Sequence, residues 1–239
     1  MSGEPVHVDL MTHDVQRACA FYGAVLGWSF EPMGPAQSAR VGGKQAAAIV
    51  PPFDGSTTGW TVYFGSTDIA ATEAAIVSAG GSLLLPPGDV GDMGKLLLAT
   101  DPGGARFGIW QAGTKKGADA WSVTGFPCWT DLRTTDPHAV QAFYAAALGW
   151  SYTAVEMAPA DYRTYSVGGD PLGGVGGLMG ATSAHWLVYF AVADVDDAAA
   201  AARGAGGGVD TEPFASPYGR MAALRDPDGQ PFWVTQLPS

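Results

Sequence analysis

The sequence predicts an α+β fold with two tandem domains, each a pair of βαβββ units that form a curved sheet around a cleft. Three observations predict it: motifs that recur in both halves of the chain, strand-like and helix-like patterns that alternate within each half, and Asp or Gly residues at the ends of the helical patterns. The composition supports buried cores, because 47% of the 239 residues are hydrophobic and only 15% are charged.

The two halves of the chain share three motifs in the same order. They are AFYGAVLGW at 20–28 and AFYAAALGW at 142–150, WTVYFGSTD at 60–68 and WLVYFAVAD at 186–194, and GKLLLATDPGGARFGIW at 94–110 with GRMAALRDPDGQPFWV at 219–234. Such colinear repetition indicates a duplicated unit. We therefore expect one domain over 1–112 and a second over 122–239, joined by a polar, glycine-containing linker at 113–121.

Strand and helix signals alternate within each half. Residues 6–12 alternate as a strand does, Asp14 suits the N-cap of a helix with an apolar face, and Gly27 suits its left-handed end. Further strands are expected at 28–33, 37–43, 44–50, 60–66, 81–87, 95–100 and 105–110, with a helix over 69–81 that Asp68 caps. Each half thus contains the βαβββ order twice. One such unit is too small to bury its sheet alone, so units are expected to pair.

Charge, cysteines and hydropathy limit the partners. A net charge of −11 disfavours nucleic acid and anionic membranes. No apolar run reaches the roughly 18 residues that span a bilayer, and no signal peptide precedes the first strand, which favours a cytoplasmic protein. Cys19 and Cys128 are too few for a disulfide framework and are interpreted as buried apolar side chains. A small molecule is the expected partner, for either a monomer or a homodimer.

The motifs FY-x3-LGW, W-x-VYF-x3-D and DP-x-G-x2-F occur once in each half. Together they resemble the vicinal oxygen chelate superfamily, which includes glyoxalases, bleomycin-resistance proteins and extradiol dioxygenases. The tandem arrangement is most similar to the two-domain glyoxalase-like proteins of actinobacteria. The resemblance implies paired βαβββ units and a cleft for a small molecule. It leaves the activity open, because the superfamily includes isomerases, lyases, oxygenases and simple binding proteins.

The resemblance also implies metal ligands at four strand positions in each metal-dependent domain. The positions in this chain hold His7, Val62, Gly108 and an alanine of 44–50 in the first half, and Trp129, Val188, Trp233 and a residue of 173–179 in the second. Only His7 can bind a metal, whereas a catalytic metal needs about three protein ligands. We therefore predict no cofactor and interpret His7 as a cavity residue. A divalent metal held by residues outside the pattern is not excluded.

Counting by twos along the strands selects the residues that face the cleft. The predicted catalytic residues are Asp9 and Asp131, and the predicted ligand-binding residues are His7, Val62, Phe64, Arg106, Trp110, Trp129, Arg133, Val188, Phe190 and Trp233. Each cleft would hold one carboxylate among apolar walls, as small-molecule pockets do. Alternatively, Asp9 and Asp131 pair with Arg106 and Arg133. Met93, Met157, Met179 and Met221, near loop glycines, are interpreted as adaptable residues at a pocket mouth.

Two functions compete on this evidence. The first is a protein with degenerate metal sites that binds a small apolar or aromatic metabolite or antibiotic. The second is a metal-independent isomerase or lyase of a small carbonyl compound, with Asp9 or Asp131 as a general base whose pKa is raised by an apolar cleft. A metal-dependent lyase or dioxygenase is a third hypothesis. The sequence leaves open whether the protein is an enzyme.

Overall fold

The computed structural model describes residues 3–53, 56–156 and 158–237. Within them the α+β prediction is confirmed. The first half contains β1 (Pro5–Met11), α1 (Val15–Leu26), β2 (Ser29–Met33), β3 (Ala36–Val41), β4 (Lys44–Val50), β5 (Gly59–Gly65), α2 (Ile69–Ser78), β6 (Ser82–Asp89), β7 (Gly94–Thr100) and β8 (Arg106–Ala112). The second half contains β9 (Pro127–Thr134), α3 (Pro137–Leu148), β10 (Ser151–Ala154), β11 (Arg163–Ser166), β12 (Gly173–Gly177), β13 (His185–Ala191), α4 (Val195–Gly204), β14 (Gly208–Ser216), β15 (Gly219–Arg225) and β16 (Pro231–Gln236).

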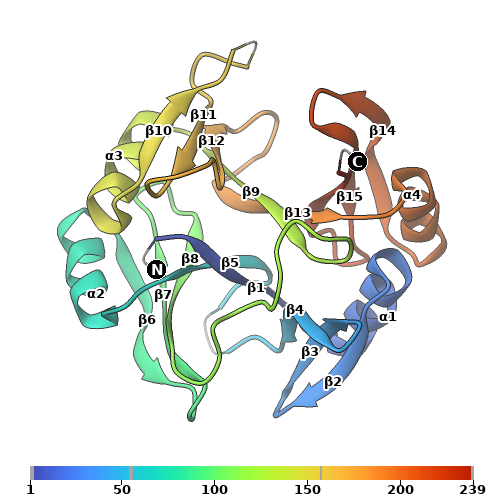
Figure 1. The fold of residues 1–239 in the computed structure, drawn as a ribbon, viewed down its shortest axis with the longest axis horizontal. Helices are drawn as coiled ribbons and strands as arrows, with labels where there is room; N and C mark the ends of the chain where they lie inside the picture. The colour runs from blue at the N-terminus through green and yellow to red at the C-terminus, as the bar shows by residue number, and fades with distance from the viewer. Residues whose placement is uncertain (1–2, 54–55, 157, 238–239) are drawn as a thin grey trace. The chain divides into compact units, whose positions relative to one another are not determined.

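Each half forms one eight-stranded sheet from two βαβββ units (Figure 1). The strand orders are β2-β3-β4-β1-β5-β8-β7-β6 and β10-β11-β12-β9-β13-β16-β15-β14. The first strand of each βαβββ unit pairs in parallel with its last strand, as β1 does with β4 and β5 does with β8. The last three strands of each of these βαβββ units form an antiparallel meander. Sequence and structure thus agree on the order of elements in every unit.

Contacts divide the chain into two compact units that both draw on the two halves. The first unit comprises Met1–His7, Thr61–Gly117 and Thr130–Trp186, and the second comprises Val8–Trp60, Ala118–Trp129 and Leu187–Ser239. Helix α2 packs on α3 in the first unit, and α1 packs on α4 in the second (Figure 1). Strands β1 and β9 each run from one compact unit into the other. The boundaries 1–112, 113–121 and 122–239 stay a prediction from the repeat.

The helix ends follow the expected residues. Each helix has an aspartate at its N-cap whose carboxylate accepts a backbone hydrogen bond, and these residues are Asp14, Asp68, Asp136 and Asp194. Helices α1 and α3 end on Gly27 and Gly149 in the left-handed conformation, at φ 70° and 72°. Helix α2 is shorter than the expected range 69–81: it ends at Ser78, two residues before Gly80, with Ala79 as the C-cap and Gly80 at a positive φ of 95°.

The core of the first unit is centred on Tyr144 of the repeated nonapeptide. Its hydroxyl donates to Asp101 Oδ2 (3.2 Å) and accepts from Trp186 Nε1 (3.3 Å). Its ring stacks on Trp150, with 4.4 Å between centroids, and the indole of Trp150 donates to the Gly3 carbonyl over 2.7 Å. The Tyr and Trp of the nonapeptide therefore link segments from both halves of the chain.

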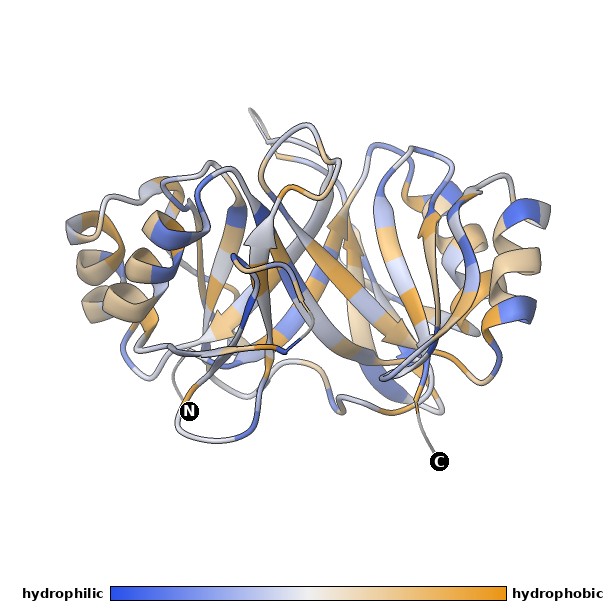
Figure 2. Ribbon diagram, turned by 90° about the horizontal axis from the view of Figure 1, so that it is seen from above, coloured by the Kyte–Doolittle hydropathy of each residue, from blue (hydrophilic) through white to orange (hydrophobic). Residues whose placement is uncertain are grey.

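The core of the second unit repeats this arrangement around Tyr22. The hydroxyl donates to Asp226 Oδ2 (3.1 Å) and accepts from Trp60 Nε1 (3.2 Å), while Trp28 Nε1 donates to the Gly125 carbonyl (2.7 Å). Figure 2 shows hydrophobic and hydrophilic segments following one another along the strands, and hydrophilic residues on some turns of the helices. The packing thus explains the duplicated motif. One tyrosine and two tryptophans make equivalent hydrogen bonds in the two cores: Tyr22, Trp28 and Trp60 in one, and Tyr144, Trp150 and Trp186 in the other.

Cys19 and Cys128 are free thiols, each half-buried rather than fully buried as the sequence suggested. Burial raises the pKa of Cys19 to about 11 and that of Cys128 to about 12. Both thiols are therefore protonated at neutral pH and poorly nucleophilic. Neither is placed to serve in catalysis.

Candidate functional site

Two faces of each sheet can be distinguished by their packing. In β8, Phe107 packs on the rings of Phe143 and Tyr144 from α3, so odd-numbered residues of β8 face the helix. Arg106, Gly108 and Trp110 point the other way, because successive side chains of a strand alternate. We call the surface turned away from the helices the site face. In β1 the fully buried Val8 and Leu10 leave His7, Asp9 and Met11 on it.

The placement of Val62 and Phe64 on the site face is wrong. Phe64 packs in the aromatic core, with its ring centroid 5.3 Å from Trp186, and Val62 shares that side. The residues of β5 that share a face with Arg106 are the odd-numbered ones, since Arg106 Nε donates to Thr61 Oγ1 over 3.0 Å. Counting back six residues from the capping Asp68 lands one residue away from the inward face.

The same one-residue error affects Val188 and Phe190. The Phe190 ring lies 5.3 Å from Trp28 and 5.1 Å from Trp60, inside the core of the second unit, and Val188 is fully buried. Tyr189 instead occupies the site face. Its ring stacks on Trp233 with 5.4 Å between centroids and 16° between planes.

The residues on the site face do not fit the metal site that the family resemblance implies. In β8 the ligand position is Gly108, which pairs with Tyr63, and any Cβ added there would clash with the Tyr63 ring. In β16 the corresponding side chain is Trp233, stacked on Tyr189. Aromatic rings thus fill the space that a coordinating side chain would need. Across the described ranges, no three His, Cys, Asp or Glu residues group closely enough to hold a metal ion.

His7 is a neutral polar group within the first unit. Burial, with a smaller contribution from the positive charge of Lys115, lowers its pKa from 6.5 to about 4. Its ring lies 5.8 Å from that of Tyr63, and its buried Nδ1 finds no hydrogen-bond partner in the described part of the chain. A neutral imidazole can donate or accept one hydrogen bond with a bound molecule, depending on its tautomer.

Asp131 forms a buried ion pair with Arg133, which matches the structural alternative given by the sequence. Asp131 Oδ2 lies 2.7 Å from Arg133 Nη2, and Tyr162 donates to Asp131 Oδ1 over 3.0 Å. The two charged residues are 3% and 7% exposed. Sequence periodicity could not predict the contribution of Tyr162, because it reaches the strand from the loop before β11.

Asp9 is also buried, at 7% exposure, and pairs along the backbone with Ala48 of β4. Of the four methionines expected at a pocket mouth, Met179 contacts Arg133 and is described below, and Met157 lies outside the described residues. Trp110 donates its indole N–H to the Lys115 carbonyl over 2.9 Å, which anchors it beside the chain that follows β8.

We give the name aromatic platform to four aromatic residues of the second unit: Tyr189, Trp233 and Phe214, whose rings are in contact, and Trp129, which lies on the neighbouring strand β9. Phe214 packs edge-on against Trp233, at 6.3 Å and 82°, and is 39% exposed. Strand β9 lies beside β13 here, because Cys128 Sγ donates to the Tyr189 carbonyl over 3.4 Å. Trp129 and Trp233 retain partial exposure. Sequence reasoning found the two tryptophans but missed Tyr189, through the parity error, and Phe214.

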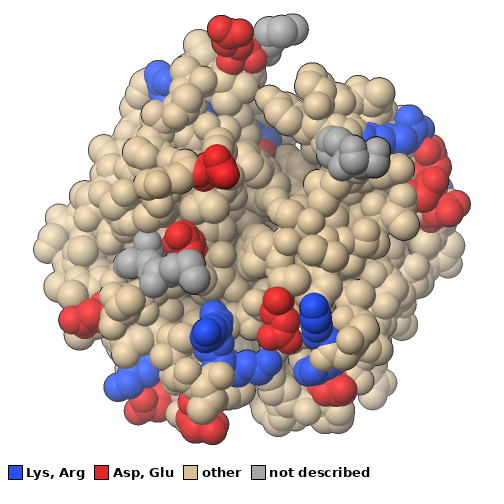
Figure 3. Space-filling model, viewed as in Figure 1, with Lys and Arg blue, Asp and Glu red and all other residues tan. Residues whose placement is uncertain are grey.

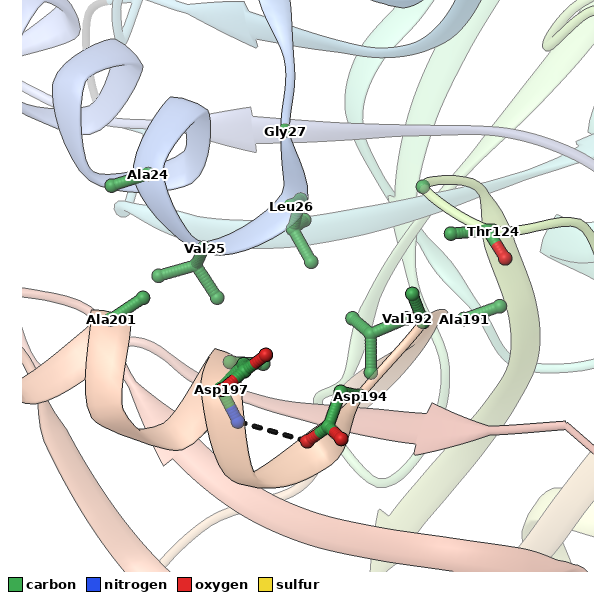
Figure 4. A pocket seen from close by; sticks show the side chains of 13 residues that line it. Ala24, Val25, Leu26, Gly27, Thr124, Ala191, Val192, Asp194, Asp197 and Ala201 are labelled. Carbon is green, nitrogen blue, oxygen red and sulfur yellow. Dashed lines mark hydrogen bonds between the residues drawn. The ribbon is translucent and has the colours of Figure 1, made fainter.

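A separate pocket of about 420 Å³ lies between α1 and α4 in the second unit (Figure 4). Its walls are apolar, with Val25 and Ala201 facing one another across it, and Asp194 and Asp197 lie at one side. Asp194 accepts from the Asp197 backbone N–H (3.0 Å) as part of the helix cap. None of the predicted catalytic or ligand-binding residues lines this pocket, which lies where several small alanine side chains of α1 and α4 meet.

Charge is sparse on the surface. Figure 3 shows one face of the molecule on which Lys, Arg, Asp and Glu side chains are scattered and most of the area carries none of them. On that face, the excess of Asp and Glu behind the net charge of −11 does not form a single acidic patch. Among the described helices, none is long and apolar enough to cross a membrane.

Comparisons with known proteins identify the family of this chain. A model described as a glyoxalase-like domain matches residues 129–235, and a bleomycin resistance protein-like N-terminal model matches residues 5–37. The glyoxylase-like protein CFP32 of Mycobacterium tuberculosis is 38% identical, over 97% of this chain and 94% of that protein. The anthracycline biosynthesis protein DnrV of Streptomyces peucetius is 32% identical, over 98% of this chain and 94% of that protein.

Solved structures share the fold. The Mn(II)-bound glyoxalase from Novosphingobium aromaticivorans has a TM-score of 0.70 at 15% identity, covering 98% of this chain and 82% of that one. The 2,3-dioxygenase LapB from Pseudomonas sp. KL28 has the same TM-score at 16% identity, covering 100% of this chain and 95% of that one. These structures show the fold alone, whereas the matched family models and the two relatives show that this chain belongs to the glyoxalase-like proteins, as the resemblance of its motifs predicted.

Proposed function

We propose that the protein binds a planar aromatic small molecule on the aromatic platform, without a metal ion. The observation that carries the proposal is the stacked pair of Tyr189 and Trp233, at the position where the family pattern expects a ligand residue. A stacked, partly exposed indole offers a flat apolar surface to a second ring system. The relatives named for anthracycline biosynthesis support a polycyclic aromatic ligand.

The chemistry of the neighbouring residues supports the same class of ligand. Phe214 lies edge-on to Trp233, so an aromatic molecule seated beside both would meet one ring face and one ring edge. Met221 shares the site face with Trp233 through the pairing of β15 with β16 and of β14 with β15, and a thioether adapts its shape to an aromatic partner. Apolar contact with few polar groups favours binding of a planar compound over catalysis on it.

The test is equilibrium binding of daunorubicin, a fluorescent anthracycline, followed by its fluorescence anisotropy. We expect saturable binding that EDTA does not change, and a loss of about tenfold or more in affinity for Trp233→Leu, which corresponds to about 1.4 kcal/mol. Trp110→Leu is the matched control, because it removes a partly exposed tryptophan from the first unit. Equal binding by Trp233→Leu and the wild type, or a loss seen only in Trp110→Leu, would reject the platform as the site.

A metal-independent isomerase or lyase of a small carbonyl compound is the second candidate. The position of Asp9 on the site face favours it, because a general base must lie within hydrogen-bond reach of the proton that it removes. Asp131 is a weaker candidate for general base, since Arg133 and Tyr162 already occupy its two carboxylate oxygens. Turnover of a 2-oxoaldehyde thiohemiacetal that survives EDTA and is lost in Asp9→Asn would support this function over simple binding.

We also propose that the protein acts in the cytoplasm and that nucleic acid is not its partner. Two free thiols and no disulfide among the described residues suit a reducing compartment, and the net charge of −11 repels phosphate backbones. Gel filtration at several concentrations would decide between a monomer and a homodimer.

A further inference from the structure

The buried guanidinium of Arg133 has one strong and one weak partner. Its Nη2 pairs with Asp131 Oδ2 over 2.7 Å, whereas its Nη1 donates to the Sδ atom of Met179 over 2.8 Å. A thioether sulfur is a weak acceptor, and hydrogen bonds between charged groups are roughly twice as strong as neutral ones. One side of a nearly buried cation is thus covered by a group that an anionic oxygen would outcompete.

Met179 is well suited to give way. Its residue is 57% exposed, so moving its side chain gives up little buried area. Its backbone has a φ of 48°, a conformation uncommon for residues with a Cβ. The side chain is unbranched and turns about three bonds, which lets the sulfur leave Arg133 without a shift of the strand.

Strand β12 and Tyr162 also pack against Arg133. Gly174 and Gly176 of β12 pair with Asp131 and Arg133 of β9, and a Cβ at either glycine would collide with the Tyr162 side chain. The glycines therefore make room for Tyr162, whose ring centroid lies 5.9 Å from the guanidinium carbon of Arg133. An Arg fixed by an ion pair and an aromatic ring loses little further entropy on binding a ligand.

We propose that Arg133 binds the carboxylate of a small molecule through Nη1, with Met179 as a cap that the carboxylate displaces. Nothing covalent changes: one N–H···S contact is exchanged for a charge-assisted N–H···O⁻ hydrogen bond. The site lies in the first unit and uses no residue of the aromatic platform, so it goes beyond the proposed function. The glycine-rich strand at 173–177 is explained by this site, because its glycines leave room for Tyr162 beside Asp131 and Arg133.

The experiment follows the methionine methyl groups by NMR in the full-length protein labelled with [methyl-13C]methionine. Benzoate is the probe, and benzamide is the neutral molecule of the same shape. We expect benzoate to shift the Met179 resonance saturably, while benzamide does not and the Met93 resonance stays in place. Met179→Leu assigns the resonance. If Met179 does not respond to benzoate, or responds equally to benzamide, the proposal is wrong.

Variants separate the two parts of the site. Arg133→Lys keeps a positive charge beside Asp131 but lacks the second donor arm, so benzoate affinity measured by calorimetry is expected to fall at least tenfold. The exposed Arg220→Lys is the control and should bind benzoate as the wild type does. Met179→Ala should bind benzoate several-fold more tightly, because the competing cap is gone. Unchanged affinity in Arg133→Lys or in Met179→Ala overturns the proposal, and neither result bears on daunorubicin binding at Trp233.

Discussion

Equivalent positions of the two site faces have diverged while the cores beneath them have not. The first unit carries His7, Tyr63 and Gly108, and the second carries Trp129, Tyr189 and Trp233 at the corresponding places in the repeat. The conserved member of each trio is a tyrosine. In the first unit the tyrosine neighbours a glycine and a histidine, whereas in the second it stacks on the indole of Trp233, and Trp129 lies on the neighbouring strand.

The difference shows how one backbone supports two surfaces. In the first unit the ring of Tyr63 fills the space next to Gly108. The neighbouring His7 adds a buried polar nitrogen, Nδ1, to the same surface. Tyr189 stacks on Trp233 and extends the apolar surface toward Phe214. Both solutions remove the metal position by filling it with an aromatic ring, yet they leave a polar site in one unit and an aromatic one in the other.

The largest expected effect comes from breaking the fit of Tyr63 over Gly108. Gly108→Ala would place a Cβ against the Tyr63 ring in a fully packed strand, and overpacking of this kind costs about 3 kcal/mol. Urea unfolding should show a matching loss in the free energy of unfolding. Gly204→Ala, at a position with open space around it, is the control and should be neutral or stabilising. A Gly108→Ala protein as stable as the wild type would show that the ring does not occupy this space.

Sequence reasoning predicted the fold almost entirely, because the fold depends on periodic and local signals. The caps at Asp14 and Asp68, the left-handed Gly27 and the order of strands were all readable from residue type and spacing. The repeated nonapeptide correctly indicated a duplication. The structural role of the repeated nonapeptide could not be predicted from the sequence. Tyr22 and Tyr144 donate hydrogen bonds to aspartates that lie 204 and 43 residues away along the chain.

The candidate site was only partly predictable, because strand parity depends on one residue of register. His7, Asp9, Arg106 and Trp233 were assigned to the correct face, whereas Val62 and its counterpart in β13 were not. A fully buried strand gives no alternating pattern that could reveal the error: every residue of β5 is buried. Loop residues such as Tyr162 and the exposed Phe214 give no periodic signal at all.

A pH titration of stability would sharpen the contrast between His7 and its counterpart Trp129. The folded-state pKa of His7, about 4, lies below its value of 6.5 in the unfolded chain. The contribution is therefore fully present above pH 6.5 and is lost as pH falls toward 4. Between pH 7 and pH 5 we expect the wild type to lose about 2 kcal/mol relative to His7→Gln. Parallel stability profiles for the two proteins would mean that the imidazole is open to solvent.

The smallest expected effect tests whether the two cores are as alike as their hydrogen bonds suggest. Tyr22→Phe and Tyr144→Phe each remove a hydroxyl that joins a buried carboxylate to an indole N–H, at a cost of about 1 kcal/mol in the free energy of unfolding. Because the partners and distances match, the two losses should agree within the error of urea titrations, and the double variant should lose their sum. Unequal losses would show that the cores have diverged along with the surfaces. Equal losses would place the divergence at the site faces, where Trp233 replaces a glycine.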